Sequence, residues 1–391
     1  MQNTFIIAPN GHPERNHKIH ILLNKWPSER CIGVETLRPL GTGELTLLRR
    51  LVIEPSMRQV DLAETLDVTR SAINQIWRKL EKDCNLRIRS TFDYGRLGVR
   101  VTFGWANDTE GSRNLLKLKR WLVSNPLTSF VAESELSSMM DKRIYFEALL
   151  PIDQRGMNYL NQLSRFQKRP YELSLVFGSA ENMSNLMNLG LFDGRDWEVI
   201  DGFRFGIIID SAKGYADILP DIQLSTQTDP VAATDEDLLV ASSIEDDYHV
   251  KSMGLASRYK ELGLSPPSER TLRRRLSSMR RDNAIPYVSI HNIGLTQRLV
   301  ITLDNRGAVS NLSRILQAQA TTLPKAKVMS CQALTALILD FPESAGLLAI
   351  SKVLSELAGD TTEMCTFIAE QTSLWGGLDS LIPPSHRQSS Q

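Results

Sequence analysis

The sequence predicts an α+β fold in which a unit of three short helices alternates twice with a small unit of strands and helices. One observation behind this is a gapless match between two helices, in which Thr69 aligns with Ser268 and Ile73 with Leu272. A second is that the segments after both helices repeat one order of strand and helix patterns. A single apolar stripe is common, whereas two in one register with similar flanks indicate a tandem duplication.

The first three-helix unit is predicted over residues 43–98. Leucines at helical spacing form its first helix, which Pro55 ends. A second short helix precedes Thr69, whose hydroxyl suits the N-cap of a third helix. Strand patterns at 86–89 and 99–103 are then predicted to pair as a hairpin, the wing of a winged helix-turn-helix domain.

The second three-helix unit is predicted over residues 234–297 and follows the same plan. Two short helices lead to a turn at 263–267, and Ser268 then caps a third helix. A second wing is predicted from Ile285 to Ile301. Caps and core stripe therefore coincide in the two units, which predicts two winged helix-turn-helix domains.

Two α/β units follow, at 99–178 and 298–372. Each carries patterns in the order strand, helix, strand, strand, helix, strand, which is that of the ferredoxin-like arrangement. The winged helix-turn-helix domains are thus predicted to alternate with two ferredoxin-like domains. Outside this repeat lie an N-terminal extension at 1–42, an extension and linker at 179–233 and a tail at 373–391.

The composition limits what the chain can bind. Lys and Arg together number 45, as do Asp and Glu, so any contact with nucleic acid must come from local clusters of charge. The four cysteines show none of the spacings of a zinc site or a disulfide framework. The absence of a signal peptide and of an apolar run as long as a membrane helix predicts a cytoplasmic protein.

The third helix of each unit is predicted to enter the major groove of double-stranded DNA. Leu272 and Leu276 turn one stripe inward, and arginines cover the opposite face. Arginine pairs with guanine, whereas the Asn and Gln of the first helix suit adenine. The candidate DNA-binding residues are Thr69, Ser71, Asn74, Gln75, Arg78 and Lys82 in the first unit and Ser268, Arg270, Thr271, Arg273, Arg274 and Arg281 in the second. The alternatives are a solvated basic face on the second helix and a protein contact or purely structural role for the first.

The segments Thr69–Glu81 and Ser268–Leu276 resemble the recognition-helix signature of the leucine-responsive/asparagine-type (feast/famine, Lrp/AsnC) transcription regulators. That signature's mid-helix arginine is kept at Arg275 and is Ile76 in the first copy. The resemblance implies a sequence-specific transcription regulator whose partners are double-stranded DNA and a small-molecule effector. Dimers of this family pair their ferredoxin-like domains, so the duplication predicts an internal pseudo-dimer, with subunit-like contacts between 99–178 and 298–370, or a higher homo-oligomer.

Two alternative functions share this predicted architecture. Sirohaem decarboxylases resemble it, sometimes as fused pairs, and the wing segments 87–89 and 97–98 are similar to theirs. Such catalysis needs basic and histidine side chains in a tetrapyrrole pocket, and His291 is the histidine near a wing. The other alternative is a scaffold whose helix-turn-helix units bind proteins.

Catalytic and metal-binding patterns were weighed separately. No Ser-His-Asp, Cys-His or paired-carboxylate arrangement has a recognisable local signature. His12, His17 and His20 cluster in the sequence without the further donors that a metal site needs. The sequence therefore predicts a protein that is not an enzyme and has no metal or cofactor.

Overall fold

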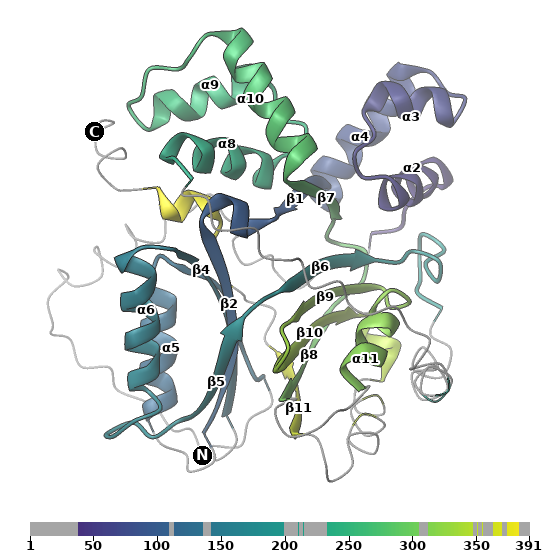
Figure 1. Cartoon of the computed structure of the whole chain (residues 1–391). Helices are drawn as coiled ribbons and strands as arrows, with labels where there is room; N and C mark the ends of the chain where they lie inside the picture. Colours follow the sequence, from purple (N-terminus) through teal and green to yellow (C-terminus); the bar gives the residue numbers. More distant parts are fainter. Residues whose placement is uncertain are drawn as a thin grey trace, which may run out of the picture.

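The computed structural model describes residues 38–108, 113–135, 142–198, 233–304, 312–346, 363–369 and 374–382, with single positions between them. His12, His17 and His20, most of the N-terminal extension and most of the predicted linker and tail lie outside these residues. Two helical units lie at one end of the molecule, above two β-sheets (Figure 1). No helix in these ranges is long and apolar enough to cross a membrane.

The first helical unit consists of α2 (Thr42–Ile53), α3 (Gln59–Thr65) and α4 (Arg70–Cys84). The predicted cap at Thr69 is confirmed, because its hydroxyl accepts a hydrogen bond from the Ala72 amide at 3.2 Å. Ile73 and Trp77 turn inward from α4, so apolar burial fixes which face of this helix is left for solvent.

The second helical unit consists of α8 (Asp235–Asp246), α9 (Ser252–Glu261) and α10 (Glu269–Asp282). The predicted cap at Ser268 is also confirmed, with its hydroxyl accepting from the Thr271 amide at 3.3 Å. Leu272 and Leu276 are both 2% exposed and form the buried stripe of α10. The two third helices thus begin and pack in the same way.

The predicted wing hairpins are wrong. Strand β1 (Arg87–Phe92) pairs with β7 (Ala284–Ser289) of the other copy, antiparallel, and not with β2 (Val99–Asp108). A short 3-10 helix, η1 (Tyr94–Leu97), and a left-handed Gly98 redirect the chain between β1 and β2. Both edges of β2 are occupied by other strands, so β1 finds its backbone partner across the molecule.

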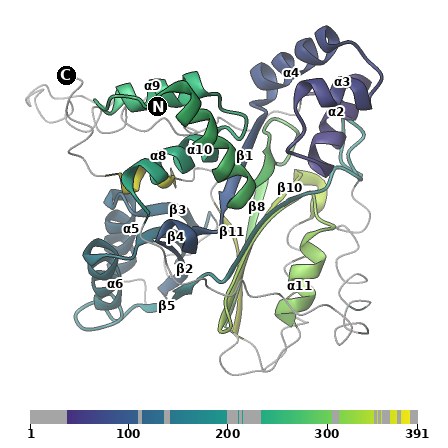
Figure 2. The same ribbon diagram turned by 45° about the horizontal axis from the view of Figure 1, so that its top comes forward.

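Each α/β unit contributes four antiparallel strands to one sheet, and in both sheets the order is fourth, first, third, second. The first sheet uses β5 (Ser174–Ser179), β2, β4 (Lys142–Pro151) and β3 (Thr128–Glu133). The second uses β11 (Glu363–Ala369), β8 (Gln297–Asp304), β10 (Leu334–Phe341) and β9 (Lys325–Ser330). Helices α5 (Asn114–Ser124) and α6 (Gln154–Arg165) cover the outer side of one sheet and α11 (Leu312–Ala320) that of the other (Figure 2).

The two copies exchange strands. After β5 the chain crosses to the second sheet as β6 (Asn182–Met187), which pairs with β9. After β11 it crosses back as β12 (Leu374–Trp375), which pairs with β3. Neither sheet is completed by its own copy alone, and sequence patterns that are local to one copy do not predict such an exchange.

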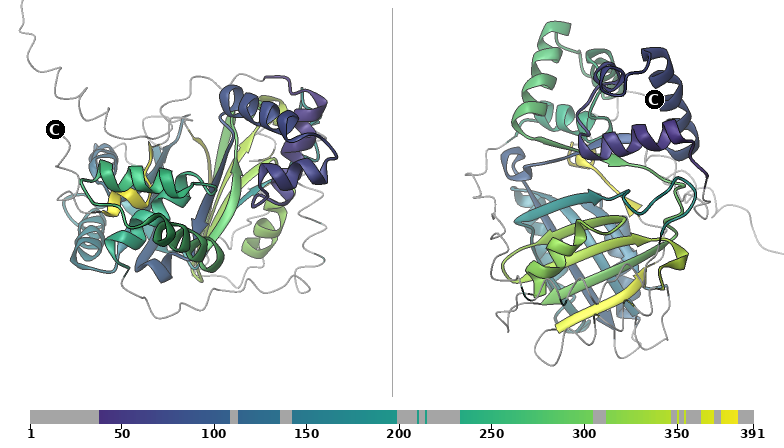
Figure 3. Two further views of the ribbon diagram at one scale, coloured as in Figure 1. Left: turned by 90° about the horizontal axis from the view of Figure 1, so that it is seen from above. Right: turned by 90° about the vertical axis from the view of Figure 1, so that its right-hand side faces the viewer.

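The sheets pack face to face in one apolar core, as Figure 3 shows from the side. Phe103 of the first sheet and Val300 of the second are both fully buried there. The Arg143 guanidinium donates to the Thr366 carbonyl at 2.8 Å, and Lys327 forms an ion pair with Glu147. The predicted contact between residues 99–178 and 298–370 is therefore present.

Candidate nucleic-acid interface and central cavity

The solvent face of α10 carries four exposed arginines, at 270, 273, 274 and 281. The side chains of Arg273 and Arg281 are 71% and 76% exposed and pair with Glu269 and Asp282. Such surface pairs contribute about 0–1 kcal/mol each, so a phosphate can replace the carboxylate at small cost. Ser268 and Thr271 lie at the N-terminal end of the same helix, where its dipole favours an anion.

Two further arginines of α10 have structural roles. Arg275, which the family resemblance singles out, forms an ion pair with Glu236 of α8 and donates to the Tyr259 hydroxyl of α9 at 3.0 Å. Arg280 donates to the Val250 carbonyl, and burial lowers the pKa of its guanidinium. These contacts fix α10 against the rest of its unit and leave the other four arginines outside.

The corresponding face of α4 is more polar and less charged. Ser71, Gln75, Arg78 and Lys82 are exposed, as is Thr69, whereas Asn74 is half-buried. Lys79 is held in an ion pair with the buried carboxylate of Glu44 at 3.0 Å. All the candidate positions on α4 and α10 therefore reach the surface, but only α10 presents a dense positive face.

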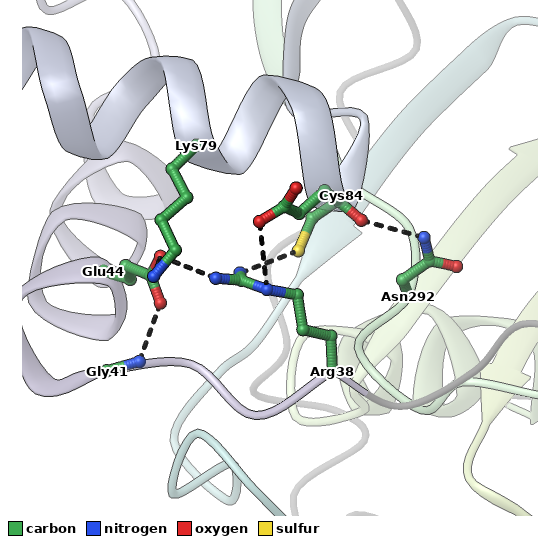
Figure 4. Close-up of polar contacts among 7 residues, drawn as sticks. Arg38, Gly41, Glu44, Lys79, Cys84 and Asn292 are labelled. Carbon is green, nitrogen blue, oxygen red and sulfur yellow. Dashed lines mark hydrogen bonds and ion pairs between the residues drawn. The ribbon is translucent and has the colours of Figure 1, made fainter.

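The base of α4 is held by a polar network that the sequence did not reveal. Figure 4 shows the Arg38 guanidinium between Glu44, at 3.0 Å, and the Cys84 sulfur, at 3.6 Å. The Gly41 amide donates to the second carboxylate oxygen of Glu44 at 2.7 Å. The Asn292 amide from the second copy donates to a carbonyl at the end of α4. Arg38 belongs to the segment assigned to the N-terminal extension, so no motif connected it with α4.

A cavity of about 100 Å³ lies where the sheets meet the β1–β7 pair. Its walls come from both sheets, from β1, η1, β7 and α8, and from residues 376–379. Lys327 and Glu147 form an ion pair on one side, and the Tyr145 hydroxyl donates to Glu147 at 3.1 Å. The other side carries Glu245, whose carboxyl oxygens accept hydrogen bonds from the Leu378 amide and the Tyr94 hydroxyl.

Glu245 has an altered acidity. Its loss of hydration, with Asp246 and Asp379 nearby, raises its pKa to about 8, although the Leu378 amide donates to it. Arg89, also in the cavity wall, lowers this pKa only in part. The sequence did not predict this site, because its carboxylates come from segments far apart that meet only when the two copies pack. His291, the histidine singled out near the second wing, follows β7, and its backbone amide donates to the Cys84 carbonyl at 2.8 Å.

Comparisons with known proteins give matches in structure alone. No family profile and no curated protein matches the sequence. The structure of the siroheme decarboxylase NirDL is similar at 11% identity and a TM-score of 0.47, over 85% of this chain and 93% of that chain. The NirDL complex with an iron-uroporphyrin III analogue is similar at 10% identity and a TM-score of 0.49, over 88% and 96%.

Solved transcription regulators match over a smaller part. An AsnC family regulator from Agrobacterium tumefaciens is similar at 15% identity and a TM-score of 0.26, over 36% of this chain and 90% of that chain. The prediction that the chain is not an enzyme is contradicted, because the structures that align along most of both chains are those of an enzyme. Structures of both kinds, AsnC regulators over part of the chain and NirDL over most of it, are thus similar to this mixed α+β chain.

Proposed function

We propose that the chain is a sequence-specific DNA-binding transcription regulator of the cytoplasm that places α10 in the major groove. The observation that carries this proposal is the exposed surface of α10, where Arg270, Arg274 and Arg281 lie opposite the buried Leu272–Leu276 stripe and Arg273 lies beside them. An α-helix fits the major groove, arginine pairs with guanine in two hydrogen bonds, and neutralised phosphates release counterions.

The proposed architecture has four domains, with helix-turn-helix units at 43–98 and 234–297 and ferredoxin-like units at 99–178 and 298–372. The two halves form an internal pseudo-dimer, supported by the exchanged strands and the shared core. In this arrangement the β1–β7 pair replaces the wing hairpins. We also propose that a small-molecule effector modulates binding.

The proposed target is asymmetric. Because α10 presents arginines and α4 presents Ser71, Gln75 and Arg78, the two helices suit different bases. We expect a guanine-containing half-site at α10 that supplies most of the affinity, and a weaker half-site at α4. A palindromic DNA target therefore does not suit two recognition helices with different side chains.

The test is selection of genomic fragments bound by the full chain at two salt concentrations, followed by titration of the selected duplex. Arg274→Gln is expected to weaken binding by about 1–3 kcal/mol, or about 5- to 150-fold, and to relax the choice of one base. Arg169→Gln is the matched control, because the Arg169 side chain is 91% exposed and follows α6, a helix that lies away from the helical units in Figure 1. Equal binding by wild type and Arg274→Gln, or retention of proteins in place of DNA, contradicts the proposal.

A second candidate function is an enzymatic reaction in the central cavity. The sirohaem decarboxylases are the enzyme class whose architecture resembles that of this chain. The specific observation is Glu245, whose raised pKa keeps a proton on it at neutral pH, a property of a general acid. A cavity of 100 Å³ is smaller than the roughly 300–1,000 Å³ of ordinary ligand sites, so a tetrapyrrole requires it to widen.

Titration with an iron tetrapyrrole tests this second candidate. A saturable shift of its visible absorbance band that Glu245→Gln alters and Arg274→Gln leaves unchanged places the site in the cavity. A band that does not shift with wild-type protein, or that shifts equally with both variants, excludes this second candidate function.

A further inference from the structure

The segment 374–382, called the strap here, connects three parts of the molecule. Its β12 pairs with β3, and the Gly376 amide donates to the Ser129 carbonyl at 2.7 Å. Its 3-10 helix η3 (Leu378–Leu381) lies beneath α8, as the yellow turn in Figure 1, with Leu378 and Leu381 fully buried. The Arg155 guanidinium of α6 donates to the Leu381 carbonyl at 2.9 Å. The strap therefore ties the second helical unit to the first sheet.

The side chain that connects α8 to the strap is Glu245. One carboxyl oxygen accepts a hydrogen bond from the Leu378 amide at 2.7 Å, and the other accepts from the Tyr94 hydroxyl of η1 at 3.3 Å. A Cβ atom added at Gly377 would lie 2.3 Å from the first oxygen. The strap backbone thus approaches the carboxyl as closely as a glycine permits.

Charges of both signs surround Glu245. Asp246 on the same helix and Asp379 on the strap are like charges, and Arg89 of β1 is a cation. Asp246 is itself paired with Arg258 of α9 at 3.6 Å. Lys327, across the cavity, is already paired with Glu147. Ionisation of Glu245 would add a negative charge to this half-buried site, where like charges and lost hydration oppose it.

We propose that Glu245 is a pH-sensitive latch: its protonated form holds the strap, and through the strap the second helical unit, on the first sheet, and its ionisation favours release. The link between α8 and the strap follows from the contacts, and the direction of its pH dependence follows from the burial of the carboxyl, which raises its pKa. Its consequence for DNA, a less fixed position of α10, rests on the function proposed above. Glu245 is in this sense a positioning residue, since it acts on α10 through α8 and the strap.

The direction of the pH dependence follows from linkage. Because the pKa of Glu245 is about 8 in the closed strap and near its usual 4.5 when released, opening loses a proton between these values. The contribution of Glu245 to strap closure is at its full value below pH 4.5 and falls as the pH rises to 8. Strap opening is then expected to rise by up to about tenfold per pH unit within this window and to level off above it.

Amide hydrogen exchange of the full chain tests the latch without DNA. The protection of the Leu378 amide, corrected for the intrinsic pH dependence of exchange, is expected to fall between pH 5 and 8 in the wild type. Glu245→Gln keeps the shape and the hydrogen-bond acceptor but does not ionise, so its protection should be flat over the same range. A flat wild-type profile, or the same slope in both proteins, overturns the proposal.

Gly377→Ala supplies an independent readout, because its methyl group displaces the carboxyl without changing any charge. We expect faster exchange at Leu378 at every pH, and unchanged exchange would contradict the latch. DNA titrations of wild type and Glu245→Gln at pH 6 and 8 form the last arm. Loss of affinity at pH 8 in the wild type alone supports control of α10, and parallel profiles exclude it. Absence of DNA binding at both pH values with the expected exchange profile refutes the proposed function and leaves the latch standing.

Discussion

The two helical units begin their third helices in the same way and use them differently. In both units a hydroxyl caps the helix and two or three large apolar side chains anchor it. In the first unit Lys79 of α4 is 57% exposed and pairs with the buried Glu44, whereas in the second four arginines of α10 are exposed. The buried stripe therefore determines how such a helix packs in its unit, while the outward positions are free to diverge.

The units also differ in how they are held on the sheets. The first is fixed by ionised groups around Glu44 and by residues 189–197, where the Trp197 indole donates to the Ile293 carbonyl at 2.6 Å. The second is fixed by the strap and by a carboxyl, Glu245, that favours its neutral form. Charged groups around Glu44 therefore hold the first unit, whereas a carboxyl that favours its neutral form, Glu245, helps to hold the second.

The largest expected effect concerns the anchoring side chains. Trp77→Ala should lower the free energy of unfolding of the first unit by about 3–5 kcal/mol, because it empties the largest buried volume of α4. Leu276→Ala should cost the second unit about 2–5 kcal/mol by the same mechanism. Denaturant titration with local hydrogen exchange separates the units, and Val68→Ala, at an exposed position, is the control. No loss in either unit would contradict equivalent roles for the two stripes.

The next effect sharpens the contrast in acidity. Burial acts to raise the pKa of Glu44, but hydrogen bonds from Gly41, Arg38 and Lys79 hold it below its usual 4.5. Glu44 therefore stabilises the first unit above pH 4.5 and loses this contribution as the pH falls further, opposite to Glu245.

Glu44→Gln should cost the first unit about 1–3 kcal/mol at pH 7 and flatten its acid sensitivity, measured by exchange across α4 from pH 3 to 7. Glu64→Gln, an exposed change in the same unit, should do neither. Acid sensitivity that survives in Glu44→Gln would assign it to another carboxylate.

The smallest expected effect is the cost of removing a helix cap, which should be equal in the two units. Thr69→Ala and Ser268→Ala each remove one cap hydrogen bond and should each cost about 1 kcal/mol. Exchange of the first-turn amides of α4 and α10 measures both, with Thr69→Ser and Ser268→Thr as conservative controls. A cost confined to one helix would show that the two starts are not equivalent.

Much of this architecture could be predicted because it is local. Thr69 and Ser268 as caps, and the apolar stripes after them, depend on residues within a few positions of each other. The packing of the two α/β units against each other was also predicted, from the duplication together with the family resemblance.

What could not be predicted depends on pairing across the two copies. Residues 87–92 carry the pattern of a strand, but nothing in it says that the partner is 284–289. The same holds for β12, and for Glu245, whose hydrogen-bond partner Leu378 lies 133 residues away in sequence. The wing hairpins were wrong because periodicity identifies strands and not their neighbours.

The exchanged strands bear on how such a molecule diversifies. In an assembly of two identical subunits every substitution appears twice, so one third helix cannot change while the other stays the same. Here β6 and β12 interlock halves that belong to a single chain, and a codon altered in one half is not copied into the other. The linkage thus permits one half to bear an arginine-rich helix while its counterpart bears a less strongly charged one, within a scaffold that both halves complete together.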